Sequence, residues 1–235
     1  MKRCIVLLFL TALLSAQAAQ EVEITAEPHH QLVLANDRVR VFNVEIPAHA
    51  ETFMHWHRHD YIYITVGHSQ VLNTVKGKDP AKLEMHDGQT GFLPGGFAHI
   101  AGNVSGQSYR NVTIELLQDE KLRHSTAHWD AAHPEEDRGL DIFNAGTKEI
   151  LFVKDGVRVS EFELQPGGVI PRHHHAGPHL VVALTDYELR SDVEGKGSER
   201  ITMKRGESRW TAGGYTHIVT NSGQHPAKFI TLEFR

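Results

Sequence analysis

The chain has 235 residues, which is enough for one large domain or for two domains of about 100 residues each. Hydrophobic residues make up 40% of the chain and charged residues 23%, a balance typical of a globular protein that buries a core. The formal net charge of −5 and the lack of a basic stripe argue against nucleic acid and membranes as partners. The unusual number is 18 histidines, because histidine is the commonest metal ligand in proteins.

The first 18 residues have the pattern of a secretory signal peptide. A positively charged start precedes the apolar run 5–14, and the small residues Ala16 and Ala18 follow with the spacing of a cleavage site. The only cysteine, Cys4, lies inside this segment, so the mature chain has neither disulfides nor thiolate ligands. We therefore expect a secreted or periplasmic protein from which residues 1–18 are removed.

The rest of the chain contains the same unit twice. A shift of 118 positions aligns the two halves without a gap. The matched pairs include His55 with His173, His57 with His175, His99 with His217, Asp37 with Asp155, Gly96 with Gly214, Asn103 with Asn221 and Glu115 with Glu233. The stretch between the halves is polar and charged, as a surface linker is. We predict a first domain over 19–117, a linker over 118–139 and a second domain over 140–235.

Each half has the pattern of short strands rather than helices. In chain order, runs with alternating side chains, rich in β-branched and aromatic residues, cover 39–46, 62–66, 71–75 and 112–116, with Gly, Pro, Asn or Asp in the turns between them. Apart from part of the linker, no stretch has apolar residues at helical spacing. Many short, evenly spaced strands predict an all-β fold with one small antiparallel β-barrel in each half.

The histidines of the second half have spacings that suit a metal site. His173 and His175 are two residues apart, so in a strand they point to the same face, and His179 has the same parity. His217 follows a Gly-Gly turn on a separate strand. Four neutral imidazoles in this arrangement can converge on one divalent transition metal ion, and imidazole suits Fe, Zn, Cu, Ni and, less strongly, Mn. Repetition of the pattern in the first half strengthens this interpretation.

The glycine-rich segment before the distant histidine carries a family resemblance. In the first half this segment matches the second motif of the cupin superfamily at every marked position, Gly88-x5-Pro94-x-Gly96-x2-His99-x3-Asn103. Its partner in the second half departs only by Ala212 in place of proline. The chain therefore resembles a secreted two-domain cupin over essentially its whole mature length.

The first cupin motif is matched more loosely. Gly167, His173 and His175 stand in its pattern, but His179 stands where the family usually has a glutamate. The counterpart of His179 in the first half is Tyr61. The paired histidines support the resemblance, whereas the glutamate ligand does not carry over.

The resemblance implies a jelly-roll β-barrel and a bound metal ion in each half. The implied metal ligands are His55, His57 and His99 in the first half, and His173, His175 and His217 in the second. His179 can replace the glutamate as a fourth nitrogen ligand. Tyr61 is a catalytic acid–base group, a ligand or a packing residue, and these alternatives stay open, as does the metal (Fe, Mn, Cu, Ni or Zn). We expect Asp60 to face outward, and we expect the histidines without a repeat partner, His30 among them, at the surface.

The functional expectations come from the same resemblance. Cupins with three-histidine iron sites include dioxygenases, so a small-molecule, dioxygenase-like oxidoreductase is the first hypothesis. The alternatives are a metal-dependent decarboxylase, isomerase or lyase without redox chemistry, and a non-enzymatic periplasmic cupin that binds a metal or another ligand. The manganese oxalate decarboxylases of the superfamily use a glutamate ligand and a lid carboxylate that have no counterpart we can identify. The expected partners are a small-molecule substrate or ligand and further copies of the chain in a homo-oligomer.

Overall fold

The computed structural model describes residues 21–117 and 138–235. Within these residues the only regular element that is not a strand is a short 3₁₀ turn, Ile24–Ala26, and no helix is long and apolar enough to cross a membrane. The predicted signal peptide (1–18) and nearly all of the predicted linker (118–139) lie outside the described residues. The expectation of an all-β fold is confirmed.

The first half forms one barrel, which we call barrel 1. Its strands are β1 (Glu21–Glu23), β2 (His30–Ala35), β3 (Val39–Ile46), β4 (Met54–His57), β5 (Tyr61–Thr65), β6 (Ser69–Val75), β7 (Ala81–Met85), β8 (Thr90–Leu93), β9 (Phe97–Asn103) and β10 (Tyr109–Leu116). They build two five-stranded sheets, with the orders β1-β4-β9-β6-β7 and β2-β3-β10-β5-β8. A buried apolar cluster with residues from both sheets fills one part of the space between them, among them Phe42, Ile46, Val71 and Tyr109.

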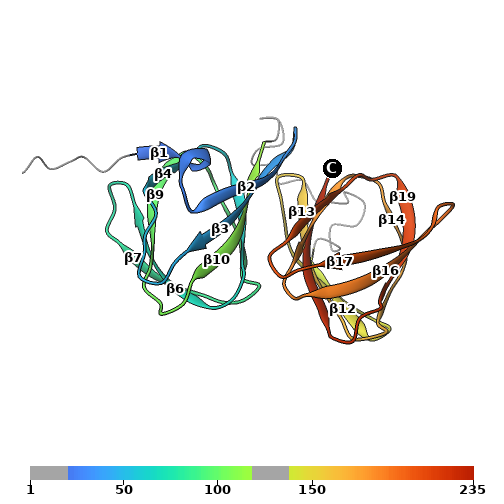
Figure 1. The fold of residues 1–235 in the computed structure, drawn as a ribbon. Coiled ribbons are helices and arrows are strands. Elements are labelled where there is room, and N and C mark those ends of the chain that lie inside the picture. The colour runs from blue at the N-terminus through green and yellow to red at the C-terminus, as the bar shows by residue number, and fades with distance from the viewer. Residues whose placement is uncertain (1–20, 118–137) are drawn as a thin grey trace, which may run out of the picture.

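The second half forms barrel 2 in the same way. Its strands are β11 (Gly139–Phe143), β12 (Gly146–Lys154), β13 (Val157–Leu164), β14 (Val169–His175), β15 (His179–Ala183), β16 (Tyr187–Val193), β17 (Gly197–Met203), β18 (Ser208–Thr211), β19 (Tyr215–Asn221) and β20 (Ala227–Phe234). They build a six-stranded sheet, β11-β12-β13-β20-β15-β18, and a four-stranded sheet, β14-β19-β16-β17. The two barrels lie side by side, barrel 1 in blue to green and barrel 2 in yellow to red (Figure 1). The fold is thus a tandem of two jelly-roll β-barrels, as predicted, whereas the residue-level domain boundaries stay predictions.

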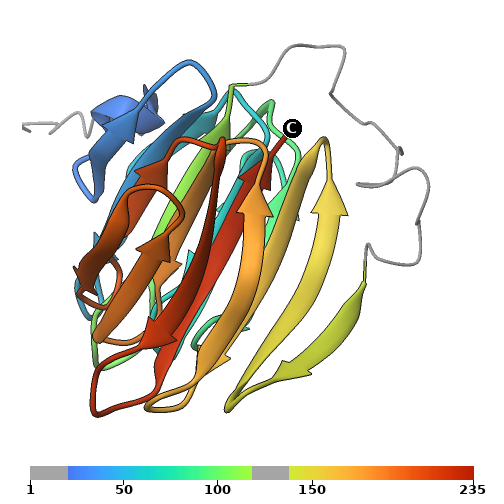
Figure 2. The same cartoon turned by 90° about the vertical axis from the view of Figure 1, so that its right-hand side faces the viewer.

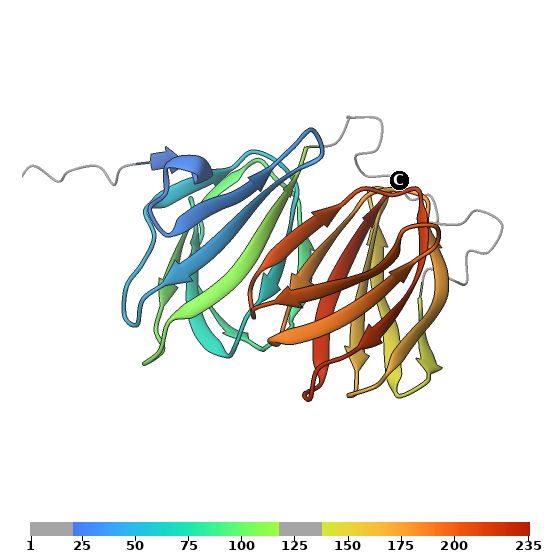
Figure 3. The ribbon, with the colours of Figure 1, turned by 45° about the vertical axis from the view of Figure 1, so that its right-hand side comes forward.

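Another apolar cluster joins the two barrels. Its buried residues come from β3, β5 and β10 of barrel 1 and from β13, β15 and β20 of barrel 2, and they include Ile62, Ile114, Leu180 and Leu232 at 0% exposure. In each of these strands the neighbouring side chains point into the barrel instead, because successive side chains of a strand alternate between its two faces. Both faces of these strands are therefore covered, one by the interior of their own barrel and the other by the second barrel (Figures 2 and 3).

Polar contacts also cross between the barrels. Arg205 forms an ion pair with Asp87 at 2.6 Å, and the Arg38 guanidinium donates a hydrogen bond to the carbonyl oxygen of Arg235. These side chains are exposed, so each contact contributes little compared with the burial of the apolar cluster. The sheets that meet here are not the ones that carry the paired histidines, which places the two histidine sites on the far sides of the barrels.

Candidate metal centre

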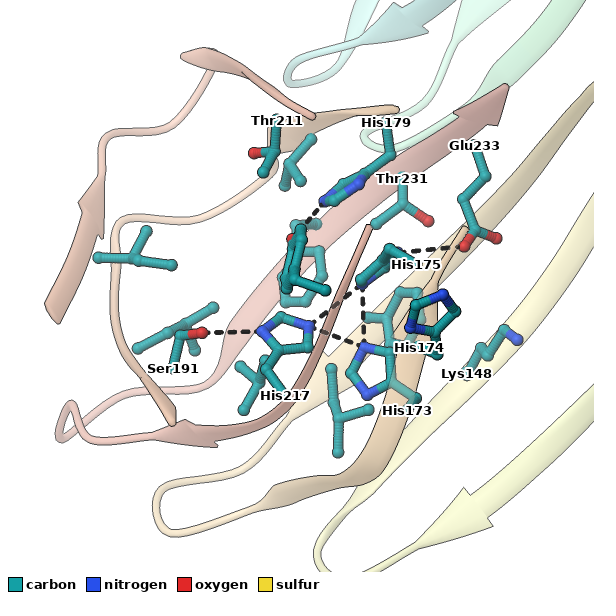
Figure 4. Close-up of a pocket in the computed structure, with 18 of the residues that line it drawn as sticks. Lys148, His173, His174, His175, His179, Ser191, Thr211, His217, Thr231 and Glu233 are labelled. Atoms are coloured by element: carbon teal, nitrogen blue, oxygen red, sulfur yellow. Dashed lines mark hydrogen bonds and ion pairs between the residues drawn. The ribbon is translucent and has the colours of Figure 1, made fainter. Parts of the chain in front are cut away.

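Three histidines of barrel 2 converge on one point. His173 and His175 lie on β14, and His217 lies directly opposite His173 on the neighbouring strand β19. The Nε2 atoms are 3.1 Å apart between His173 and His175, 3.1 Å between His175 and His217, and 3.0 Å between His217 and His173. Figure 4 shows the three rings turned toward one another. Strand parity and cross-strand register together produce this triad.

The first half of the chain repeats the arrangement. His55 on β4 is paired in register with His99 on β9, and His57 follows two residues after His55. The Nε2 atom of His57 lies 3.2 Å from that of His55 and 3.1 Å from that of His99. The six histidines that the cupin resemblance implies as ligands are therefore brought together in two groups of three.

The Gly-Gly turns before His99 and His217 position the strands that carry them. A Cβ atom on Gly95 would lie 2.4 Å from the backbone of His59, and one on Gly213 would lie 2.4 Å from the backbone of Gly177. The second glycine of each turn has a positive φ, 88° at Gly96 and 82° at Gly214. Only glycine meets both requirements without strain, and the backbone N–H of this second glycine donates to the carbonyl of His57 or His175 at 2.7 Å.

Hydrogen bonds at the other ring nitrogen orient the histidines of barrel 2. The Nδ1–H of His173 donates to the carbonyl of Pro171 at 2.8 Å, and Nδ1 of His217 lies 2.8 Å from the Ser191 hydroxyl. Nδ1 of His175 faces the carboxylate of Glu233 at 3.5 Å. An acceptor at Nδ1 places the proton there and leaves the lone pair on Nε2, which is how metal-binding histidines are commonly held.

In barrel 1 the Nδ1 atoms of two triad histidines have different hydrogen-bond partners, at the repeat positions of those in barrel 2. The Nδ1–H of His55 donates to the carbonyl of Phe53 at 2.9 Å, and that of His99 donates to the side-chain oxygen of Asn73 at 2.6 Å. Nδ1 of His57 is buried without a hydrogen-bond partner. The Nε2 lone pairs of His55 and His99 are thus presented to the middle of the triad.

The two triads have the donor set and the spacing of divalent transition-metal sites. Two nitrogen ligands at about 2.1 Å from one ion are about 3.0 Å apart at right angles and about 3.4 Å apart in a tetrahedron. The Nε2 separations of 3.0 to 3.2 Å are nearer the right-angle value. Without a cation, neutral imidazole lone pairs face one another in a buried place, which is unfavourable. Among the described residues, the groups of close metal donors are His30, His55 and His57 in barrel 1 and His173, His175 and His217 in barrel 2, all of them histidines.

The pKa values of the triad histidines predict a pH effect on the metal-free protein. Burial lowers the pKa of His55 to about 4, and the pKa values of His99 and His217 to about 3. The unfolded chain takes up these protons near pH 6.5, so between pH 6.5 and 4 it binds more protons than the folded chain. The free energy of unfolding should therefore fall as the pH falls through this window. Glu115 acts in the opposite sense, because burial raises its pKa to about 6, but it is one group against several.

Urea unfolding of chelator-treated protein at pH 7.5, 6.5, 5.5 and 4.5 checks this prediction. Each pKa unit of difference corresponds to about 1.4 kcal/mol per group, so a loss of several kcal/mol is expected between pH 6.5 and 4.5. A free energy of unfolding that stays constant over this range would contradict the burial of neutral histidines.

His179 and Tyr61 occupy matching places, as ring partners of a triad histidine. The His179 ring is stacked on His175 with the centroids 4.1 Å apart, and the Tyr61 ring is stacked on His57 at 4.2 Å. Nε2 of His179 faces the hydroxyl of Tyr215 at 3.3 Å, and it is not one of the three nitrogens that converge (Figure 4). The fourth-ligand role of His179 and the catalytic role of Tyr61 stay predictions. In this conformation both residues pack against a ligand ring from the opposite sheet.

Replacing Tyr61 by phenylalanine separates packing from chemistry. Tyr61 is 4% exposed, and burial raises the pKa of its hydroxyl, so the group is neutral. Because Tyr61→Phe keeps the stacked ring, we expect full metal content and a change in stability below about 1 kcal/mol. Metal analysis and thermal unfolding measure both. Loss of metal would contradict the stacking arrangement, and a fall in turnover at full metal content would assign the hydroxyl an acid–base role.

One expectation about the residues near the first site is wrong. His30 is 9% exposed rather than at the surface, because β2 begins there and His30 pairs in register with Val44 at the barrel interior. Asp60 is 7% exposed, and its carboxylate accepts the N–H of Gly95 at 2.7 Å, but it does not line the cavity of barrel 1, so its expected outward orientation stays a prediction. His30 was not predicted as a site residue because the second half of the chain has Lys148 at the matching position. The spacing of three residues between Glu27 and His30 is the sequence signal that could have indicated a carboxylate-supported histidine here.

Cavities open beside both triads. The cavity in barrel 2 has a volume of about 650 Å³, and the one in barrel 1 has a volume of about 590 Å³. About half of the side chains that line the barrel 2 cavity are hydrophobic, among them Phe143, Phe162, Ile170, Val181, Leu189, Ile201, Val219 and Phe229, and most of the others are polar or charged. Lys148 also lines this cavity. Each triad is thus on the wall of a space large enough for a small organic molecule.

The chain is thus a protein of two jelly-roll barrels, each with three convergent histidines that form a candidate metal site. Residues 160–233 match the family model of the cupin domain. The whole described fold resembles solved oxalate decarboxylases. A structure of the Bacillus subtilis enzyme, reported for its Mn(II) centres, is 11% identical, covers 85% of this chain and 69% of that chain, and has a TM-score of 0.60. The Lactobacillus farciminis enzyme in a formate complex is 13% identical, covers 84% and 77%, and has a TM-score of 0.58.

No curated protein sequence matches the chain. At identities this low, the likeness to the decarboxylases concerns the fold alone. The second half of the chain therefore matches the cupin domain family, and the described chain as a whole has the fold of these two-barrel proteins.

Proposed function

We propose that this chain is a metal-dependent enzyme, a dioxygenase-like oxidoreductase, that acts on a small organic molecule in barrel 2. The observation that carries the proposal is the triad of neutral imidazoles on the wall of a largely apolar cavity of about 650 Å³. The residues that would hold the metal are His173, His175 and His217. A bound iron or manganese ion would supply Lewis acidity and a change of oxidation state.

The residues around the triad are suited to bind and orient a substrate. The apolar walls exclude water and contact a hydrophobic substrate body. Lys148 lies in the same wall and offers a cation to an acidic substrate group. Tyr215 and His179 form a polar pair at 3.3 Å, in which burial raises the pKa of Tyr215 to about 12 and lowers that of His179 to about 4. Both groups are therefore neutral, and the hydrogen bond between the Tyr215 hydroxyl and Nε2 of His179 holds a transferable proton beside the cavity.

Elemental analysis followed by oxygen uptake tests the proposal. The protein is purified without a histidine tag, its metal content is measured, and oxygen consumption is followed with small thiols and with small molecules that carry two adjacent oxygen donors. We expect iron or manganese bound at the triads, and oxygen uptake that is lost in the His173→Ala/His175→Ala variant. Firmly bound zinc or copper without any turnover would contradict the enzyme and favour a binding protein.

A second candidate is a decarboxylase without net redox chemistry. Lys148 in the cavity wall favours it, because an ammonium group beside the metal site would hold a carboxylate, and oxalate decarboxylases share the fold. Against it, the described donor clusters contain no carboxylate. Release of CO₂ from small carboxylic acids without oxygen consumption would favour the decarboxylase and contradict the oxidoreductase.

We also propose that the enzyme is exported through residues 1–18 to the periplasm or the medium and that it forms a homo-oligomer. Cell fractionation with N-terminal sequencing of the mature chain tests the first point. Light scattering of the purified protein tests the second.

A further inference from the structure

Barrel 1 contains a fourth histidine that the triad does not account for. One ring nitrogen of His30 lies within 4.8 Å of the ligand nitrogens of His55 and His57, and all three side chains are buried. The ring of His30 lies 4.6 Å from that of His55 between centroids. Nitrogen ligands on opposite sides of one ion are about 4.2 Å apart, so the position of His30 is within reach of an ion bound to His55 and His57.

A buried carboxylate fixes the orientation of His30. The Nδ1–H of His30 donates to Oε2 of Glu27 at 2.6 Å, so the lone pair of His30 is on Nε2. Glu27 is 2% exposed, and although burial alone raises its pKa, its bonds to His30 and to the backbone N–H of His29 lower it overall. The carboxylate of Glu27 is thus fixed by two hydrogen bonds, one from the backbone N–H of His29 and one from the ring of His30.

The same carboxylate supports a second ligand. Oε1 of Glu27 accepts the backbone N–H of Phe53 at 3.3 Å, and the carbonyl of Phe53 in turn accepts the Nδ1–H of His55 at 2.9 Å. Glu27 thus connects the two histidines His30 and His55 from one buried position. A buried histidine without a ligand role would not need a buried carboxylate that also supports a second histidine.

Barrel 2 lacks each part of this arrangement. Its repeat positions are Lys148 for His30, Ala145 for Glu27 and Pro171 for Phe53, and proline has no N–H to donate. The positions correspond in space as well, because Lys148 pairs with Phe162 just as His30 pairs with Val44. The difference is therefore confined to one side of the triad, where barrel 1 has a nitrogen donor and barrel 2 has a cation.

We propose that His30 is a fourth nitrogen ligand of the metal ion in barrel 1, positioned by Glu27, and that barrel 2 keeps this side open toward Lys148. The inference rests on the proposed function, in that both triads bind a metal ion. A fourth nitrogen ligand leaves fewer free positions on the ion in barrel 1 than the three ligands leave in barrel 2, and free positions are what make an ion accessible to substrate. Barrel 1 then holds its metal more tightly than barrel 2, and barrel 2 is the catalytic barrel.

Binding of Cu²⁺ to isolated sites tests this assignment. The His173→Ala/His175→Ala background leaves barrel 1 as the single site, and chelator competition then gives the affinity, while electron paramagnetic resonance reports the number of bound nitrogens. We expect His30→Ala to weaken binding by at least tenfold with the loss of one nitrogen, and Glu27→Gln to weaken it by about 10–100-fold. His29→Ala, next to His30 in sequence, is the matched control and should change nothing. Circular dichroism of the metal-free variants checks that they fold.

The reverse change gives a second test. In the His55→Ala/His57→Ala background only barrel 2 binds, and the double substitution Ala145→Glu/Lys148→His should strengthen Cu²⁺ binding there and add one nitrogen. One result would overturn the fourth ligand alone. In it, His55→Ala abolishes Cu²⁺ binding in barrel 1, whereas His30→Ala changes neither the Cu²⁺ affinity nor the number of bound nitrogens. No Cu²⁺ binding in either background, with both proteins folded, would overturn the proposed metal centres and this inference with them.

Discussion

The double variant His173→Ala/His175→Ala is expected to lose the metal of barrel 2 completely while barrel 1 stays loaded. The two residues supply two of three convergent nitrogens, and His217 alone on β19 cannot hold an ion firmly. The barrels have separate triads on their far sides, so the loss should not spread from one to the other. Elemental analysis per chain measures the change, from two equivalents of metal to one.

His174→Ala is the matched control for this variant. His174 lies between the two ligands, but it is exposed, and its Nδ1 faces the Thr216 hydroxyl at 3.0 Å instead of the triad. It should keep two equivalents of metal. Full metal in the double variant, or metal lost from both barrels with the fold intact, would contradict the ligand set.

Leu180→Ala is expected to destabilise the whole protein by about 2–5 kcal/mol. Leu180 is 0% exposed in the apolar cluster between the barrels, and its truncation leaves a cavity that both barrels line. Because the cluster is shared, we expect one cooperative transition in urea for the two barrels together. Leu140→Ala is the control, since Leu140 is 60% exposed and should change stability by less than about 0.5 kcal/mol. A similarly small effect for Leu180→Ala would show that the barrels fold independently of their contact.

Much of the fold was predictable because the chain is a duplication. Alternation over 39–46 and 112–116 predicted strands that the structure contains as β3 and β10. The parity of His55 and His57 predicted a shared face, and the repeated glycine-rich segment predicted that His99 would join them, as it does. These predictions depend only on local backbone geometry and on the repeat.

The remaining features depend on contacts between distant strands. Parity placed Tyr61 and His179 toward the triads, but it does not determine whether a ring stacks on a ligand or turns a nitrogen toward the metal. The position of His30 beside the triad could not be predicted, because it depends on the register of β2 with β3 and on the carboxylate of Glu27. The shared cluster also depends on tertiary packing, although the apolar residues on the outer face of β5, Ile62 and Ile64, are in hindsight its sequence signal.

The measurement that tests the central claim most directly is anomalous X-ray scattering from crystals of the untagged protein. Data collected at the absorption edge of the metal found by elemental analysis locate that metal in the chain. We predict two peaks, one within bonding distance of Nε2 of His55, His57 and His99, and the other within bonding distance of Nε2 of His173, His175 and His217. Ordered triads without a peak, in protein shown to contain metal, would contradict the account.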